Sequence, residues 1–228
     1  MKWSNKFNYP KSSRSLEDGY RKYLLGDNKL PSVTTILSAT KSEEEKAALA
    51  NWISRVGVKE SNKIKTEASS RGTFMHTYIE EFLRGRINES FFESNEQYKN
   101  MAKEIIEKGI DNKLDEIYGI EETLYYPEQY AGSADLIGVY QGNDVVIDFK
   151  QSNKPKKTDY IQDYFLQLGA YTLAHDVVHG TKMKAGIILL CTKDILFQEF
   201  KIEGAELEMY QNLFLGRVKK FYEMNNIA

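Results

Sequence analysis

The stretch Val145–Lys150 reads VVIDFK, the composition of a buried strand that ends in two opposite charges. Because side chains alternate along a strand, Asp148 and Lys150 point to the same face and Phe149 points to the other. A buried charge without a partner is costly in free energy. We therefore expect this pair either to neutralise itself or to face a wet cleft or a metal ion.

A second acid is expected beside this pair. The preceding segment Gly132–Tyr140 reads GSADLIGVY, and the residues QGND at 141–144 are typical of a tight turn. The two segments should form an antiparallel hairpin that brings Asp135 to the same end of the sheet as Asp148. Oxygen ligands from adjacent strands suit Mg²⁺, and Lys150 could orient or deprotonate an attacking water. An exposed cross-strand salt bridge is the structural alternative.

Hydrophobic periodicity predicts an α/β fold with a central mixed β-sheet of about five strands flanked by helices. Strands are expected at 121–127, 132–140, 145–150, 184–191 and 195–202. Helices are expected at 42–56, 59–84, 95–115, 160–178 and 204–224. The first helix should carry a capping box from Ser42 and Glu45, and the second is open to a break near Arg71–Gly72. Residues before 30 lack a clear period and are expected to form an irregular arm.

Composition excludes several protein classes. With 41% hydrophobic and 28% charged residues the chain resembles an ordinary globular protein. Its apolar runs are too short to cross a bilayer and its N-terminus has no apolar signal core. We therefore expect no membrane partner and a cytoplasmic location, or the host-cell cytoplasm for a viral protein, with a mitochondrial location left open. A net charge of -2 argues against coating nucleic acid by bulk charge.

Helical spacing brings further polar residues together. Gln167 and Tyr171 are four residues apart in a largely apolar helix, as are His76 and Glu80 in another. His175 and His179 share this spacing, which can bind zinc. Because no third ligand is evident, we expect these two histidines to complement the C-terminus of their helix and leave them out of the site.

The ordered set of His76, the GSAD segment with Asp135, Asp148 with Lys150, and Gln167 with Tyr171 resembles the PD-(D/E)xK nuclease superfamily, specifically its RecB-like exonuclease branch. Within that branch, LPSVTTIL at 30–37 and RGTFMHTYIEEFL at 71–83 are similar to the mitochondrial genome maintenance exonucleases and related phage exonucleases. The resemblance covers about residues 30–175.

The resemblance implies a restriction-endonuclease-like core at 61–228, preceded by a helical or irregular extension at 1–60 within a single nuclease domain. It also implies that Mg²⁺ or Mn²⁺ is held by Asp135, Asp148, His76 and the carbonyl of Phe149. Lys150 would be the catalytic lysine, and Gln167 and Tyr171 would support the site and the nucleic acid backbone. An iron-sulfur cluster of the cysteine-bound branches needs four cysteines, and this chain has only Cys191.

Four further polar residues are candidates for binding the DNA backbone. The guanidinium of Arg71 and the hydroxyls of Ser32 and Thr34 could donate hydrogen bonds to phosphates, and Lys154 follows the catalytic strand directly. An ordinary turn for PSVTT and a solvated loop for Lys154 are the alternatives.

The predicted function is a metal-dependent DNA exonuclease that prefers single-stranded DNA with free ends. This preference for single strands comes from the resemblance and not from the charges. A structure-specific endonuclease of the same fold and a non-catalytic DNA-binding module are the alternative functions.

Overall fold

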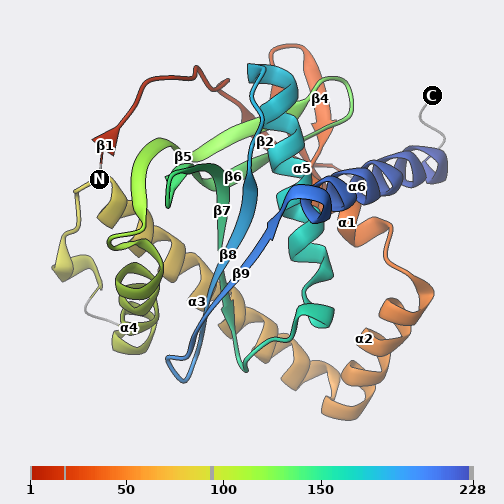
Figure 1. Ribbon diagram of the computed structural model, residues 1–228. Helices are drawn as coiled ribbons and strands as arrows, with labels where there is room; N and C mark the ends of the chain where they lie inside the picture. Colours follow the sequence, from red (N-terminus) through yellow and green to blue (C-terminus); the bar gives the residue numbers. More distant parts are fainter. Residues whose placement is uncertain (1, 18, 93–94, 226–228) are drawn as a thin grey trace.

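The computed structural model describes residues 2–17, 19–92 and 95–225. At its centre lies a six-stranded sheet with the order β1-β5-β6-β7-β8-β9 (Figure 1). Strand β1 pairs in parallel with β5, and β7 with β8, whereas the other neighbours are antiparallel. The predicted mixed sheet is confirmed, with the short β1 added to the five expected strands. The strands are β1 (Lys2–Trp3), β5 (Leu114–Tyr126), β6 (Tyr130–Tyr140), β7 (Asn143–Ser152), β8 (Ala185–Thr192) and β9 (Phe197–Glu203).

Helices cover both faces of this sheet (Figure 1). One hydrophobic core lies under α1 (Val33–Ala39), α5 (Gln162–His179) and α6 (Gly204–Met224). The other lies under α3 (Val58–Leu83) and α4 (Glu96–Ile105), which continues as a π-helix at Ile106–Ile110. All eight residues of β8 are buried, as expected for a strand covered on both faces.

The alternation predicted for VVIDFK is confirmed. Val145, Ile147 and Phe149 belong to the core under α3 and α4, whereas Val146 belongs to the core under α5 and α6. Asp148 and Lys150 therefore share the face with Val146. The preceding hairpin turn uses Gln141 and Gly142 with φ of 48° and 77°, which are the backbone angles that a two-residue turn between twisted strands requires.

One of the predicted helices matches the structure closely and two differ from it. The α2 helix (Glu43–Val56) begins with the predicted capping box of Ser42 and Glu45. The α3 helix runs without the break expected near Arg71–Gly72, because one helical glycine costs only about 1 kcal/mol. The helix predicted to end near 115 stops at Ile110, since Asn112 adopts φ 60° and turns the chain into β5.

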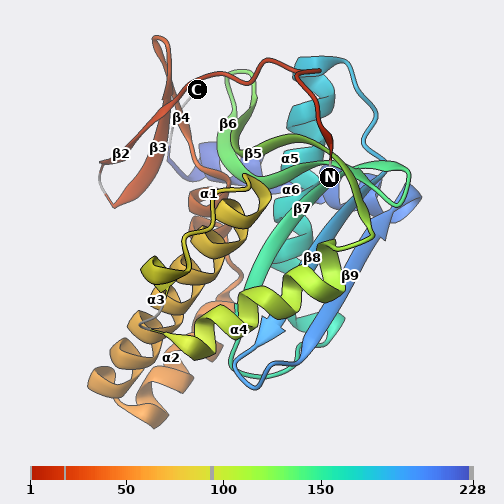
Figure 2. The ribbon, with the colours of Figure 1, turned by 90° about the vertical axis from the view of Figure 1, so that its left-hand side faces the viewer.

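The irregular arm expected before residue 30 is found only at residues 4–12 and is wrong for the region that follows. This region forms a second, antiparallel sheet of β2 (Ser13–Glu17), β3 (Tyr20–Leu25) and β4 (Asn28–Pro31), which lies beside β6 (Figure 2). Tyr23 and Leu30 of this sheet are buried against Ala131. The division into an extension at 1–60 and a core at 61–228 stays a prediction, and its terminal residues 1 and 226–228 lie outside the described residues.

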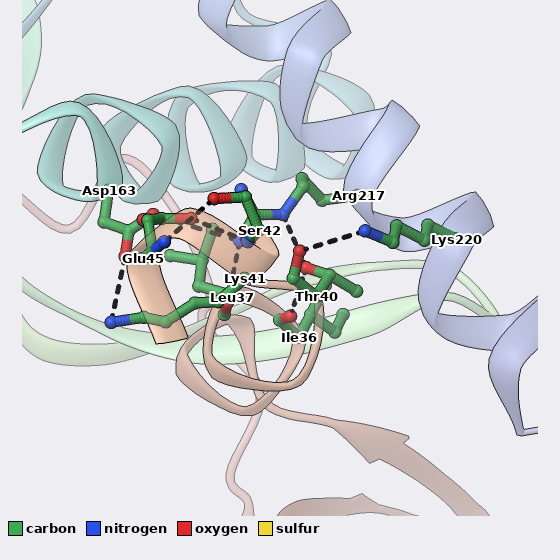
Figure 3. Close-up of polar contacts among 9 residues, drawn as sticks. All are labelled: Ile36, Leu37, Thr40, Lys41, Ser42, Glu45, Asp163, Arg217 and Lys220. Atoms are coloured by element: carbon green, nitrogen blue, oxygen red, sulfur yellow. Dashed lines mark hydrogen bonds and ion pairs between the residues drawn. The ribbon is translucent and has the colours of Figure 1, made fainter. Parts of the chain in front are cut away.

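The α2 helix and the first half of α3 project away from the central sheet (Figure 2). No side chain of α2 is buried. Polar contacts hold the base of α2 to the body: the Arg217 guanidinium of α6 donates to the Leu37 carbonyl at 2.8 Å and to the Thr40 hydroxyl (Figure 3). Lys41 lies 3.8 Å from the Asp163 carboxylate of α5. These contacts fix where α2 leaves the domain.

Two 3-10 turns, Glu89–Phe92 and Thr158–Tyr160, complete the secondary structure of the described residues. Within 2–17, 19–92 and 95–225, no helix is both long enough and apolar enough to cross a bilayer.

Candidate active site

The site lies where β6 and β7 separate. The last recorded pair of their ladder is Leu136 with Ile147, so Asp135 and Asp148 are the next residues along the two strands. Beyond that pair, the Phe149 N–H donates to the Asp135 carboxylate at 2.7 Å instead of to a backbone carbonyl. A side chain thus replaces the ladder at this point, and the two predicted acids meet at one end of the sheet.

A third acid lies in the same row. Because β5 pairs Ile120 with Leu136 and Glu122 with Ala134, Glu121 stands opposite Asp135. Its φ of 55° is unusual for a residue other than glycine. Its carboxylate accepts a hydrogen bond from the Ser133 hydroxyl at 2.9 Å. Three adjacent strands therefore each contribute one carboxylate to this row.

Lys150 forms an ion pair with Asp148. Only 2% of the Asp148 side chain is exposed, and its Oδ2, which pairs with the Lys150 ammonium, has no other partner among the described residues. The Lys150 ammonium also lies 5.2 Å from the centre of the Tyr164 ring. The ion pair predicted as one alternative is thus present.

The α3 helix brings His76 to the same place. Its Nε2–H donates to the Phe149 carbonyl at 2.8 Å, and its Nδ1 lies 3.5 Å from Asp135 Oδ1. The predicted set of His76, Asp135 and the Phe149 carbonyl is therefore contiguous.

Burial and mutual repulsion shape the charges of the site. Burial and the Asp135 carboxylate together raise the pKa of Asp148 to about 6, against the opposing effect of the Lys150 ammonium. Burial and the charge of Asp135 likewise raise the pKa of Glu121. Burial alone would lower the pKa of His76, but the Asp135 carboxylate outweighs it and the pKa rises to about 9. Asp148 and Glu121 therefore resist carrying full charge, whereas His76 and Lys150 outweigh burial and lower the pKa of Asp135.

These groups suit a hard divalent cation. Ligand atoms of His76, Glu121 and Asp135 all lie within 4.8 Å of one another. Oxygen and imidazole ligands are compatible with Mg²⁺ and Mn²⁺. Binding an ion through His76 Nε2 and the Phe149 carbonyl would replace the hydrogen bond between them and displace the Nε2 proton. The Asp148 carboxylate, which faces the same cavity, adds a further oxygen ligand to this set.

The site opens into a cavity of about 430 Å³. Eight of the predicted residues line it: Ser32, Thr34, His76, Asp135, Asp148, Lys150, Gln167 and Tyr171. Gln167 donates to the Tyr171 hydroxyl at 3.2 Å, which links the predicted helical pair. The Tyr171 ring lies so close to Gly132 that a methyl group there would come within 2.6 Å of it, which explains the glycine of the GSAD segment.

Besides Phe149, whose carbonyl contacts His76, two predicted residues do not line this cavity. Arg71 is buried, and its guanidinium donates to Gln151 at 2.7 Å and to Asn153, so that it joins α3 to the end of β7. Lys154 is exposed in the loop after β7. Neither residue is brought together with the acids, and their contact with DNA stays a prediction.

Sequence reasoning missed several residues of the cavity, notably Glu121, Arg14 and Arg21. The signal for Glu121 was the register of the hairpin between β5 and β6, which sets it opposite Asp135. The adjacent Glu122 does not line this cavity; together with Glu121 it lines a second hollow beside Tyr9 and Thr123. The arginines belong to the N-terminal sheet, whose pairing was not predicted.

Comparison with known proteins identifies sequence relatives, although no protein-family model matches the chain. Human mitochondrial genome maintenance exonuclease 1 is 28% identical over 214 residues, covering 86% of this chain and 59% of the human protein. The mouse protein of the same name is 30% identical over 180 residues, covering 73% of this chain and 51% of the mouse protein. The chain thus spans less than two thirds of either relative.

Among solved structures, an alkaline exonuclease from Laribacter hongkongensis aligns with a TM-score of 0.32 and 19% identity, over 70% of this chain and 84% of that chain. This likeness is weak, so the fold rests on the elements described above. The sequence comparison is stronger. The chain is a sequence relative of the mitochondrial genome maintenance exonucleases, and the resemblance predicted from its motifs is confirmed.

Proposed function

We propose that this protein is a metal-dependent DNA exonuclease that hydrolyses phosphodiester bonds. The observation that carries the proposal is the meeting of Asp135, Asp148 and Lys150 at one strand fork that opens into a cavity. The names of the sequence relatives, both exonucleases, support the same reaction class.

Asp135, Asp148, His76 and the Phe149 carbonyl would hold the ion, with Glu121 as an additional ligand. Mg²⁺ or Mn²⁺ bound there would polarise the phosphoryl oxygens and lower the pKa of the attacking water. The accumulation of three carboxylates around one buried row supports this assignment, because their repulsion is relieved by a divalent cation.

Lys150 provides the positive charge that the reaction needs beside the metal ligands. Burial lowers its pKa, but Asp148 and Asp135 outweigh burial and raise the pKa overall. The side chain therefore remains an ammonium, which favours orienting the water and offsetting charge on the phosphoryl group over removing a proton. Asp148 fixes the ammonium in place through the ion pair.

The remaining polar lining suits a nucleic acid backbone. The Thr34 hydroxyl and the pair of Gln167 and Tyr171 line the cavity and can donate to phosphate oxygens. Ser32 is already used, because its hydroxyl accepts from the Thr35 N–H at 3.0 Å and caps α1. A preference for single-stranded DNA with free ends is proposed from the family resemblance. The cytoplasmic location stays a prediction beside the mitochondrial alternative.

The direct test uses end-labelled single-stranded DNA with Mg²⁺ or Mn²⁺. We expect short products from the wild-type protein and none after chelation with EDTA. Asp148→Ala and Lys150→Ala should lose the activity while circular dichroism shows a folded protein. Unchanged turnover by Lys150→Ala would contradict the role proposed for Lys150 in hydrolysis.

Circular single-stranded DNA separates the alternative functions. An exonuclease leaves it intact, whereas a structure-specific endonuclease of the same fold cuts it. DNA binding without any metal-dependent turnover of linear DNA would favour the non-catalytic binding module.

A further inference from the structure

The N-terminal sheet presents two different charged faces. In the register of β2 and β3, Arg14 stands opposite Tyr23, and Arg21 lies two residues before Tyr23 on the same face. We call this the inner face, because Tyr23 packs on Ala131 of β6. The outer face carries Glu17, Lys22 and Lys29.

The cations of the two faces differ in their partners. On the outer face, the Lys22 ammonium lies 3.5 Å from the Glu17 carboxylate, and Lys29 pairs with the same carboxylate. On the inner face, the Arg14 and Arg21 side chains make no ion pair or hydrogen bond to residues within 2–17, 19–92 and 95–225. Both arginines are exposed and line the same cavity as Asp135 and Lys150.

Contacts with the rest of the protein nevertheless restrain Arg14 and Arg21. The Arg14 guanidinium lies 5.9 Å from the centre of the Tyr23 ring, which is 3% exposed. The backbone of Arg21 is held at both ends, because its N–H donates to the Thr35 hydroxyl at 3.1 Å and its carbonyl accepts from the Ser32 N–H at 3.0 Å. Two anchored arginines therefore leave their guanidinium groups available at the cavity wall.

Charge and geometry indicate what these groups recognise. The floor of the cavity carries Glu80, Glu121, Asp135 and Asp148, which repel a polyanion. The planar guanidinium matches phosphate oxygens with two parallel donors, unlike the point charge of a lysine. Resting on the proposed function, we propose that Arg14 and Arg21 bind phosphate groups of a single-stranded DNA substrate and hold the strand beside the cleavage site.

The test measures DNA binding without hydrolysis. In the Lys150→Ala protein with EDTA, the affinity for a fluorescent single-stranded oligonucleotide is measured by anisotropy at several salt concentrations. The test variant carries Arg14→Gln and Arg21→Gln. The matched control carries Lys22→Gln and Lys29→Gln, which remove the same charge from the other face of the same sheet.

We expect the inner-face variant to bind about tenfold more weakly, as for the loss of charge-assisted hydrogen bonds. The slope of log affinity against log salt should fall by about 1.4, because each phosphate contact to a single strand contributes about 0.7. The outer-face control should stay within about twofold of the parent, with an unchanged slope. Equal weakening by both variants, or no change from the inner-face variant, would overturn the proposal.

Two further arms sharpen this result. If the double variant fails to fold, Arg14→Lys with Arg21→Lys keeps the charge and should weaken binding by several-fold while the salt slope stays near that of the parent; unchanged affinity counts against the proposal. Oligonucleotides with and without a terminal phosphate distinguish binding of the strand end from binding of internal phosphates. Turnover by the wild-type protein is scored separately, so failure of the nuclease proposal is distinguishable from failure of this one.

Discussion

Two polar clusters lie along α5, and only one has the features of an active site. The first half of the helix carries Gln167 and Tyr171 toward the cavity that holds Lys150. Its last turns carry His175 and Asp176, which lie beside the N-terminal residue Tyr9 and Thr181. Both clusters are built from buried polar groups within a hydrophobic core.

The His175 cluster is fully satisfied. The Thr181 hydroxyl donates to Asp176, so His175 Nδ1–H donates to Thr181 at 2.8 Å. The other nitrogen, Nε2, then accepts from the Tyr9 hydroxyl at 3.1 Å. Every partner of the neutral ring is in place, and burial lowers the pKa of His175 to about 3. This arrangement stabilises one fold and leaves no donor or acceptor for a ligand.

The cluster at the strand fork is not satisfied. Three carboxylates share it with one ammonium and one imidazole, and the crowding shows in the raised pKa values of Asp148 and Glu121. This difference indicates that the cluster at the strand fork, and not the His175 cluster, binds a ligand. Substitutions should therefore remove activity at the fork and remove stability at His175.

The largest expected effect is on hydrolysis at the fork. Asp148→Asn keeps the shape of the side chain but removes a ligand charge and the anchor of Lys150, so the rate on single-stranded DNA should fall by about 10³-fold or more. The free energy of unfolding, measured by chemical denaturation, should change by less than about 1 kcal/mol, because the substitution also removes repulsion with Asp135. If the free energy of unfolding fell by as much as the activation free energy of hydrolysis rose, the distinction between the two clusters would be contradicted.

The second prediction concerns the pH dependence of stability. The pKa of His175 is about 3 when folded and 6.5 when unfolded, so the unfolded state binds the proton first. The neutral histidine stabilises the fold fully above pH 6.5, and this contribution is lost at up to ~1.4 kcal/mol per pH unit as the pH falls toward 3.

Urea titrations from pH 7 to pH 4 measure this loss. His175→Gln should remove that part of the pH dependence while leaving hydrolysis at pH 8 unchanged. An identical pH dependence in the variant would show that His175 is not the titrating group.

The third prediction separates two adjacent acids. Glu121→Gln should weaken Mn²⁺ binding by about 10- to 100-fold, as for groups that support a metal site. Glu122→Gln serves as the control, because Glu122, unlike Glu121, does not line the cavity that holds Asp135 and Asp148. Calorimetric titration of both variants with Mn²⁺ measures the effect. Equal losses of Mn²⁺ affinity in the two variants would mean that the effect comes from negative charge in general and not from ligation by Glu121.

The smallest effects are expected from two glycines. Gly132→Ala forces a methyl group against the Tyr171 ring and should cost about 1 to 3 kcal/mol of stability. Gly216→Ala lies in α6 with nothing within 4 Å and should stabilise by up to about 1 kcal/mol. Thermal unfolding of both variants checks the signs. A neutral Gly132→Ala would mean that Tyr171 moves freely.

Local sequence patterns were sufficient to predict that Asp135, Asp148 and Lys150 lie together. The alternation of VVIDFK set Asp148 and Lys150 on one face, and the turn at 141–142 brought Asp135 beside them. Glu121 was missed because its position depends on pairing with β6 and on a left-handed backbone, which no local pattern indicates.

Longer-range structure was harder to predict. Charged residues on both faces of β3 hide its alternation, so the N-terminal sheet and its arginines were not expected. The turn signals were present, because Gly19 and Gly26 adopt φ of 81° and 59°. The contact of the Arg71 guanidinium with Gln151 was not foreseen, because it depends on how α3 packs beside β7; binding of phosphate by Arg71 stays a prediction.

A crystal soaked in Mn²⁺ tests the central claim most directly. Anomalous scattering should reveal a peak at the fork, ligated by Asp135 and by at least one of Asp148, His76 and Glu121, with none at His175. Absence of a peak at the fork at Mn²⁺ concentrations that support hydrolysis, or a peak only elsewhere, would contradict the account.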